Sequence, residues 1–235
     1  MLEKLLEFDK RITVRLNRYK NKLLTPIIKF FAFFGQEPFW FAIIAYFVFI
    51  WYDPTAFVIL GGTFLAGLYI VVPLKYIVKR ERPFQKIDEI IFLDVPQLSK
   101  SFPSWHSYNI ISLSCATLYY SQNWLLFPIL ALFSLMVCYS RIYLGSHYFL
   151  DVICGIIFGF VGFTINILTT QLWLSLIYAI EGFYIYPVIH QYWVTVIFTQ
   201  WWYLLLVISV YCVIFMNAYY SLVIKRKKKK SIESV

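Results

Sequence analysis

The sequence predicts an all-α protein, a polytopic bundle of about six or seven transmembrane helices preceded by an amphipathic helix. Of the 235 residues 61% are hydrophobic and only 14% are charged, which is more apolar than a soluble domain of this length requires. Apolar runs recur along nearly the whole chain, and several approach the roughly 20 residues that a helix needs to cross a bilayer. Residues 1–224 are therefore expected to form one membrane domain.

The first helix is predicted over residues 1–22, where apolar residues recur at helical spacing among charged ones, as in helices that lie on a membrane surface. Residues 25–34 form a short apolar segment, which predicts an interfacial or re-entrant helix. The longer apolar runs are predicted as spans: 38–51, 55–74, 104–120, 124–142, 148–169, 172–189 and 192–224. Segment 75–103 is rich in charge and is expected in the aqueous phase.

The net charge of +9 is concentrated in the N-terminal stretch, the central loop and an unbroken basic run, residues 225–230. A basic run directly after an apolar span is typical of a cytoplasmic end and attracts anionic headgroups. Residues 225–235 are therefore predicted to be a cytoplasmic tail, and a nucleic acid is not expected as a partner. The four cysteines stand singly within apolar runs and are interpreted as packing residues.

Charged and protic residues near membrane spans are costly, so their clusters are candidate functional sites. Three such clusters stand at span ends, and the hairpin of residues 104–142 returns the third cluster to the membrane face of the first two. Their members are Lys75, Arg82, Ser104, Trp105, His106, Ser140, Arg141, His147 and Asp151. The remaining basic residues of the loop are interpreted as topological anchors: Lys79, Arg80, Lys86 and Lys100.

This set of side chains suits a phosphoryl group, because lysine and arginine supply charge and donors for phosphate oxygens. Ser104 is placed to cap the next helix, and phosphate binds well at a helix N-terminus. His147 and Asp151 are four residues apart, so on a helix the carboxylate would orient and activate the imidazole as a nucleophile. His106 is the candidate general acid. No metal-ligand pattern is present, and neither a metal nor another cofactor is expected.

The three clusters resemble the signature of the type 2 phosphatidic acid phosphatase superfamily, which reads K-x6-R-P, then P-S-G-H, then S-R-x5-H-x3-D. The first and third motifs fit residue for residue, at residues 75–83 and 140–151. The middle motif departs from the pattern, since Trp105 stands where the family has glycine. The resemblance covers roughly residues 55–159 of the chain.

The resemblance implies a metal-independent membrane phosphatase that acts on a lipid phosphate monoester or diphosphate through a phosphohistidine. His147 would be the nucleophile, with Asp151 as its partner and His106 as the acid. The phosphate would be bound by Lys75, Arg82, Ser104, the backbone N–H of Trp105 and Arg141. No residue of the sequence separates phosphatidate from a polyprenyl diphosphate or another phosphorylated lipid.

Two alternatives remain open at this stage. A lipid phosphotransferase would use the same histidine pair, although the transferase branch of the family often lacks some of the cations found here. A non-catalytic member or an ion-handling membrane protein is favoured only by Trp105. Five predicted spans separate the central loop from the tail, so the site is expected to face away from the cytoplasm.

Overall fold

Helices dominate the computed structural model, which describes residues 2–97, 99–184 and 200–233, and no strand occurs within these ranges. The α-helices are α1 (Leu2–Arg18), α2 (Leu24–Phe33), α3 (Glu37–Ala45), α4 (Pro54–Val78), α5 (Pro83–Lys86), α6 (Trp105–Ser121), α7 (Phe127–Tyr143), α8 (Phe149–Tyr184) and α10 (Trp201–Glu233). A π-helical turn, η1 (Tyr46–Ile50), continues α3, and a 3-10 turn, η2 (Trp124–Leu126), precedes α7. The predicted all-α class is confirmed.

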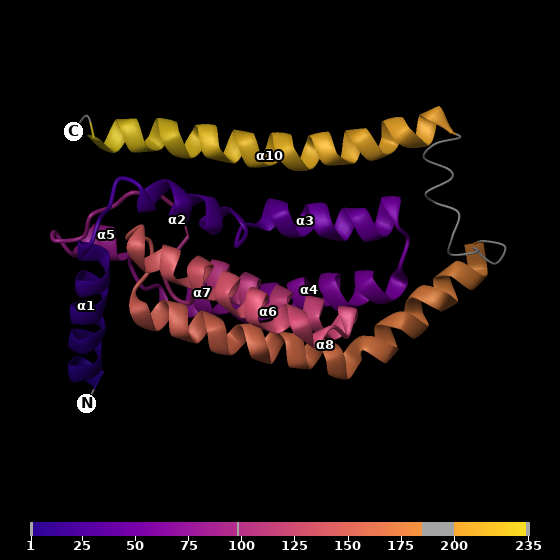
Figure 1. Cartoon of the computed structure of the whole chain (residues 1–235), viewed down its shortest axis with the longest axis horizontal. Helices are drawn as coiled ribbons and strands as arrows, with labels where there is room; N and C mark the ends of the chain where they lie inside the picture. Colours follow the sequence, from indigo (N-terminus) through magenta and orange to yellow (C-terminus); the bar gives the residue numbers. More distant parts are fainter. Residues whose placement is uncertain (1, 98, 185–199, 234–235) are drawn as a thin grey trace.

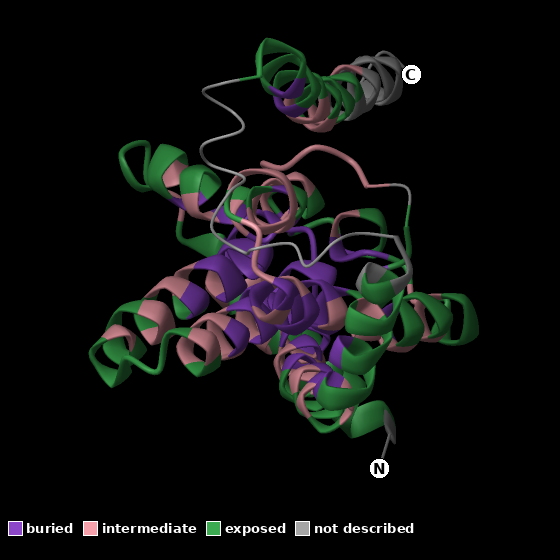
Figure 2. Cartoon of the chain, turned by 90° about the vertical axis from the view of Figure 1, so that its right-hand side faces the viewer, coloured by how far each residue is buried: buried purple, intermediate pink, exposed green. Residues whose placement is uncertain are grey.

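The centre of the molecule is a bundle of α4, α6, α7 and α8, which run side by side along its long axis (Figure 1). Helix α1 crosses one end of this bundle, α2 packs on α7, and α10 packs on α3 at the outer side. Buried residues concentrate where the central helices meet, whereas most of residues 201–220 in α10 are exposed (Figure 2). Such exposure of apolar helices is expected for a protein whose solvent is lipid.

Four helical segments of the described chain are long and apolar enough to cross a membrane, and they belong to α4, α7, α8 and α10. The pair formed by α2 and α3 with η1 is bent by 48° and makes a fifth if it crosses as one span. This number is below the six or seven spans expected from the sequence, partly because two predicted spans form the single helix α8 and α6 has only 17 residues. The chain is a multi-pass membrane protein.

Helix α8 corrects one of the expected boundaries, because residues 149–184 form a single helix where two spans were predicted. The polar residues at the expected break do not interrupt the helix, since their side chains bond to its own backbone. Thr169 donates to Ile165 O at 3.0 Å, and Thr170 donates to Asn166 O at 2.9 Å. The start of the last predicted span and His190 lie outside the described residues.

This single helix changes the relation between the two ends of the chain. The C-terminal end of α10 lies at the same end of the bundle as α1 and α5 (Figure 1). The basic run 225–230, expected as a separate tail, continues α10 as helix up to Glu233. The sequence placed the central loop and the tail on opposite membrane faces because five passes were predicted between them. Two of these predicted passes are one helix, α8, so the opposite placement no longer follows from the count.

Close packing between α4 and α8 depends on small residues and one buried amide. Asn166 of α8 donates to Ile59 O at 2.9 Å and to Thr63 Oγ1 at 3.0 Å, which ties α8 to the middle of α4. A methyl group added at Gly62 would lie 2.0 Å from Asn166 Oδ1, whereas one added at Gly61 would meet only the Phe57 ring, at 3.5 Å. Small residues of this kind let membrane helices approach closely.

We expect Gly62→Ala to lower the melting temperature of the detergent-solubilised protein, because the new methyl group must displace a buried amide whose nitrogen is bonded to α4. Overpacking of this kind typically costs about 1–3 kcal/mol. The neighbouring Gly61→Ala variant, with the same gain in helix propensity and ordinary contacts, should melt at or above the temperature of the unmodified protein. Equal melting temperatures for the two variants would contradict the described contact between α4 and α8.

Candidate active site

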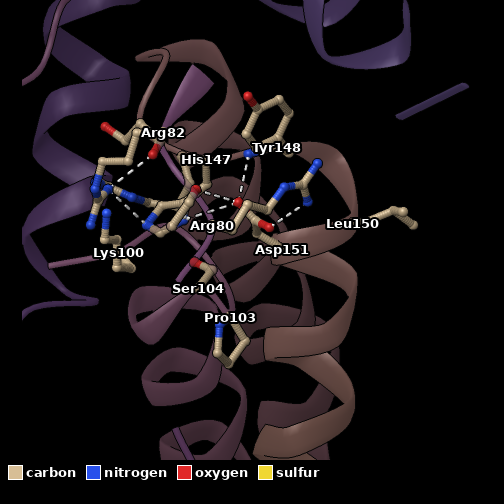
Figure 3. Close-up of polar contacts among 12 residues, drawn as sticks. Arg80, Arg82, Lys100, Pro103, Ser104, His147, Tyr148, Leu150 and Asp151 are labelled. Carbon is tan, nitrogen blue, oxygen red and sulfur yellow. Dashed lines mark hydrogen bonds and ion pairs between the residues drawn. The ribbon is translucent and has the colours of Figure 1, made fainter. Parts of the chain in front are cut away.

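The three sequence clusters meet at the end of the bundle that α1 crosses (Figure 3). Helix α4 ends at Lys79, whose φ of 51° turns the chain toward Arg82 at the start of α5. After α7, Gly145 takes a φ of +78°, a conformation that favours glycine, and the turn leads to His147. The structure therefore brings the three clusters together, as their positions in the sequence predicted.

The relation between His147 and Asp151 differs from the prediction in one respect. His147 lies in the turn before α8, and only Asp151 belongs to the first helical turn, so the two do not share a helix face. His147 Nδ1 lies 3.6 Å from Asp151 Oδ2, somewhat beyond hydrogen-bond range. Ser101 lies between them: its hydroxyl donates to Asp151 Oδ2 and is 3.4 Å from His147 Nδ1.

The imidazole of His147 lies between a cation at Nε2 and a carboxylate near Nδ1. Burial lowers the pKa of His147 well below its usual range, and the charges of Arg82 and Lys75 lower it further. The Arg82 guanidinium donates to Nε2 at 3.2 Å. Since a guanidinium has no acceptor, Nε2 carries no proton, and the proton of the neutral ring lies on Nδ1 toward Asp151.

Asp151 is fully buried, and both of its carboxylate oxygens accept hydrogen bonds. Its Oδ2 accepts the backbone N–H of Tyr148 at 3.0 Å, and its Oδ1 accepts from Arg80 at 2.7 Å. The same guanidinium forms an ion pair with Asp9 of α1 at 2.5 Å. Arg80, interpreted from the sequence as an anchor at the membrane edge, is instead partly buried and paired with the carboxylate of the site.

The first two candidate phosphate ligands are bonded to oxygens of the loop that precedes α6. Lys75 Nζ donates to the carbonyl oxygens of Lys100 and Pro103, both at 2.8 Å. Arg82 donates from Nε to Ser99 O at 2.9 Å. Each of these cations thus already donates to oxygen acceptors, the kind of atom that a phosphate also offers.

Arg141 is only 1% exposed and is the third candidate cation. It donates to Asp94 Oδ2 at 2.7 Å, and the same carboxylate oxygen accepts the hydroxyl of Ser146 at 2.5 Å. Burial alone would raise the pKa of Asp94, but Arg141 and Ser146 outweigh it and hold that pKa below its usual value. Arg141 Nε is buried and has no hydrogen-bond partner within the described residues.

Ser104 caps α6 as predicted, because its Oγ accepts the backbone N–H of Ser107. The Ser104 N–H is bonded to Asp151 O at 2.9 Å, which fixes the start of α6 against the start of α8. The ring of Trp105 was expected where the chain approaches a ligand, but it stacks on Tyr108 at 5.7 Å and packs in an apolar cluster with Phe64. The extra bulk is therefore accommodated in the core.

His106 lies in the first turn of α6, mostly buried, in electrostatic contact with Arg141 and Asp94. The structure records no hydrogen bond for its ring within the described part of the chain. Ser140, for which a site role and a bond to its own helix were equally open, donates to Val137 O at 2.6 Å. The same described residues contain no group of three or more His, Cys, Asp or Glu side chains arranged to hold a metal ion.

Sequence reasoning missed four side chains of this site: Asp9, Arg80, Asp94 and Ser101. Ser101 and Asp94 carry no spacing signal, since they reach the site from an irregular loop. Asp9 did leave a trace, because Asp9, Thr13 and Asn17 recur every four residues and are all fully buried. The buried stripe of α1 is thus polar and faces the site.

Comparison with known proteins places these residues in a family context. The sequence profile of the PAP2 superfamily matches residues 56–175. An undecaprenyl-diphosphatase from Sulfolobus acidocaldarius is 24% identical over 152 residues, which cover 65% of this chain and 73% of that protein.

Two solved structures share the fold. The crystal structure of Aquifex aeolicus LpxE superimposes with a TM-score of 0.61 at 22% identity, covering 67% of this chain and 93% of that one. The first transmembrane PAP2-type phosphatidylglycerolphosphate phosphatase from Bacillus subtilis gives a TM-score of 0.58, also at 22% identity, and covers 69% and 84% of the two chains.

Proposed function

The chain belongs to the PAP2 superfamily, and from this premise we propose that it hydrolyses a lipid phosphate monoester or diphosphate at the membrane surface through a phosphohistidine. The observation that carries the proposal is the geometry of His147: a buried imidazole whose Nε2 lies 3.2 Å from the Arg82 guanidinium and whose Nδ1 faces the Asp151 carboxylate. A nucleophile with its electron pair free, next to positive charge that binds its target, is what phosphoryl transfer to a side chain requires.

In the proposed first step the Nε2 electron pair of His147 attacks phosphorus, and the bond between phosphorus and the leaving oxygen breaks. The imidazole becomes positively charged, and the Asp151 carboxylate opposite Nδ1 stabilises it. The Arg82 guanidinium, which now donates to Nε2, would move its donors to the phosphate oxygens. Lys75 and Arg141 would supply further donors.

His106 is proposed as the general acid that gives its proton to the leaving oxygen, which belongs to the lipid alcohol in a monoester and to the lipid-attached phosphate in a diphosphate. In the second step the neutral His106 takes a proton from water, the hydroxide oxygen attacks phosphorus, and the bond to His147 breaks. Inorganic phosphate is released, and His147 returns to its neutral form. The position of His106 in the first turn of α6, two residues after Ser104, supports this role.

The substrate class is proposed to be a phosphorylated membrane lipid, because the site lies at the end of a bundle of helices that are apolar enough to cross a membrane. The named relatives act on undecaprenyl diphosphate and phosphatidylglycerolphosphate, which both carry phosphate next to a lipid chain. For this chain we propose a substrate of the same kind, a lipid that carries a phosphate at the membrane surface. A panel of such lipids tests which of them is hydrolysed.

His147→Ala should abolish phosphate release from the active lipids of such a panel, and His106→Ala should lower kcat by about 100-fold or more, since loss of a general acid typically costs 10²–10⁴-fold. Purified protein is assayed by malachite green with phosphatidate, phosphatidylglycerophosphate and undecaprenyl diphosphate, with and without EDTA. Both variants should keep the melting temperature of the unmodified protein to within a few degrees.

Lys79→Ala serves as the matched control, because Lys79 is exposed and has no described contact with the site. Undiminished phosphate release by a folded His147→Ala variant would overturn the proposed nucleophile. Transfer of labelled phosphate to an added alcohol without phosphate release would instead identify a phosphotransferase with the same nucleophile.

Asp94→Asn should strengthen inhibition by inorganic phosphate, because the Asp94 carboxylate now occupies the Arg141 donor that a phosphate oxygen would use. We expect the inhibition constant to fall by about fivefold, the equivalent of about 1 kcal/mol for a partly exposed ion pair. The exposed Asp88→Asn, in the same loop, removes the same charge without this contact. Weaker inhibition in Asp94→Asn than in Asp88→Asn would show that Asp94 does not compete with phosphate.

We further propose that the site faces the cytoplasm. All 21 lysines and arginines lie in segments 4–29, 75–100 and 225–230 or at Arg141, and α1, α5 and the end of α10 mark one end of the bundle in Figure 1. The connections at the opposite end, residues 46–53 and 119–126, contain none. Basic residues flanking membrane spans concentrate on the cytoplasmic side, so this distribution favours a cytoplasmic site.

In intact cells a membrane-impermeant maleimide should fail to label Asp88→Cys and Lys228→Cys, and it should label Ser121→Cys, at the far end of α6. The background carries serine in place of the native cysteines. After permeabilisation all three variants should react. Labelling of Asp88→Cys in intact cells would overturn the proposed orientation, and labelling of Asp88→Cys and Lys228→Cys from different sides would contradict the shared end of α5 and α10.

A further inference from the structure

The N-terminal helix α1 contributes side chains to the start of α8, the segment that carries Asp151. The first backbone N–H groups of a helix have no partner within the helix and need acceptors from elsewhere. Here two of the acceptors come from α1: Asp9 Oδ1 accepts the N–H of Leu150 at 2.8 Å, and Thr13 Oγ1 accepts the N–H of Phe149 at 3.0 Å. Two side chains of α1 thus cap the N-terminus of α8.

The second connection between α1 and the site is the arginine that joins two buried carboxylates. Arg80 NH1 is 2.7 Å from Asp151 Oδ1, and Arg80 NH2 is 2.5 Å from Asp9 Oδ2. The guanidinium lies over the ring of Tyr148, 3.7 Å from its centroid, so its plane is fixed as well. Both carboxylate side chains are fully buried, whereas the arginine side chain is 19% exposed.

We propose that Asp9 and Arg80 are positioning residues for the reaction: together they hold the Asp151 carboxylate and the first turn of α8 in the orientation that directs Oδ2 toward His147. This inference rests on the proposed phosphatase function and adds to it two residues outside the three motifs. It makes α1, predicted only to lie on the membrane surface, a part of the active site.

The charges explain why this arrangement needs both partners. Two buried carboxylates share one guanidinium, so removal of Arg80 leaves two uncompensated anions close together. Asp151 would then either take up a proton or turn toward another donor, and in both cases His147 would lose the carboxylate that stabilises its charged form. Removal of the Asp9 charge leaves Arg80 held from one side only, so the guanidinium and the Asp151 carboxylate can turn together away from His147.

The test compares Arg80→Gln and Asp9→Asn with Lys79→Gln, which removes one positive charge at the adjacent, exposed position. We expect both site variants to lower kcat by about 10- to 100-fold with little change in KM, since small misplacements of catalytic groups cost up to about 100-fold. Lys79→Gln should keep the kcat of the unmodified protein. Arg80→Lys should recover only part of the loss, because a lysine cannot bridge two carboxylates as a fork.

Two further measurements separate positioning from mere attachment of α1. Asn17→Ala removes hydrogen bonds from α1 to the carbonyls of Ile91, Ile142 and Tyr143 without touching Asp151. At an equal loss of melting temperature, Asp9→Asn should lower kcat more than Asn17→Ala does. The double variant Asp9→Asn with Arg80→Gln should be no slower than the worse single variant, because both act through one carboxylate.

The outcomes distinguish this inference from the proposed function. If the unmodified protein releases phosphate and His147→Ala does not, but Arg80→Gln and Asp9→Asn keep the kcat of Lys79→Gln, the positioning role is overturned and the phosphatase stands. Equal kcat losses for Asp9→Asn and Asn17→Ala at equal melting temperature would likewise reduce Asp9 to an anchor. Absence of phosphate release in every protein tested would overturn the function itself.

Discussion

One buried carboxylate organises the end of the bundle where the candidate site lies. The side chain of Asp151 accepts from Arg80, Ser101 and the N–H of Tyr148, and its backbone carbonyl accepts the N–H of Ser104. These bonds join α4, the central loop, α6 and α8. A buried charge is tolerated only when it is paired and fully hydrogen-bonded. The need to satisfy Asp151 therefore determines how the ends of these helices meet and where the neighbouring His147 comes to lie.

The positive side chains around this carboxylate are satisfied by the protein itself. Lys75 binds loop carbonyls, Arg82 binds Ser99 and His147, and Arg141 binds Asp94. Oxygen acceptors thus stand opposite each cation, as phosphate oxygens would in a complex. A ligand has to replace these contacts rather than fill an empty charged cavity, so its binding energy is the difference between two sets of similar bonds.

How far the sequence predicts this site depends on the separation of the partners. Residues joined by short motifs, such as Lys75 with Arg82 or His147 with Asp151, carry a spacing that indicates a shared function, and the structure brings them together. Pairs such as Asp9 with Arg80 are joined across 71 positions, and nothing in a single sequence links them. The helical class follows from composition, but the merging of two expected spans into α8 depended on threonine hydroxyls bonding to their own helix. Local polarity alone does not reveal that choice.

Trp105 shows how a departure from a family pattern is accommodated without loss of the site. Its backbone stays in the first turn of α6, which Ser104 caps, while its ring packs against Phe64 and Tyr108 in the apolar core. The indole N–H, buried and without a partner in the described chain, is the cost of this packing. Because the ring points into the core, the substitution leaves the neighbouring His106 and the backbone N–H groups of the turn in place. The side chain that most favoured a non-catalytic protein is therefore a packing residue.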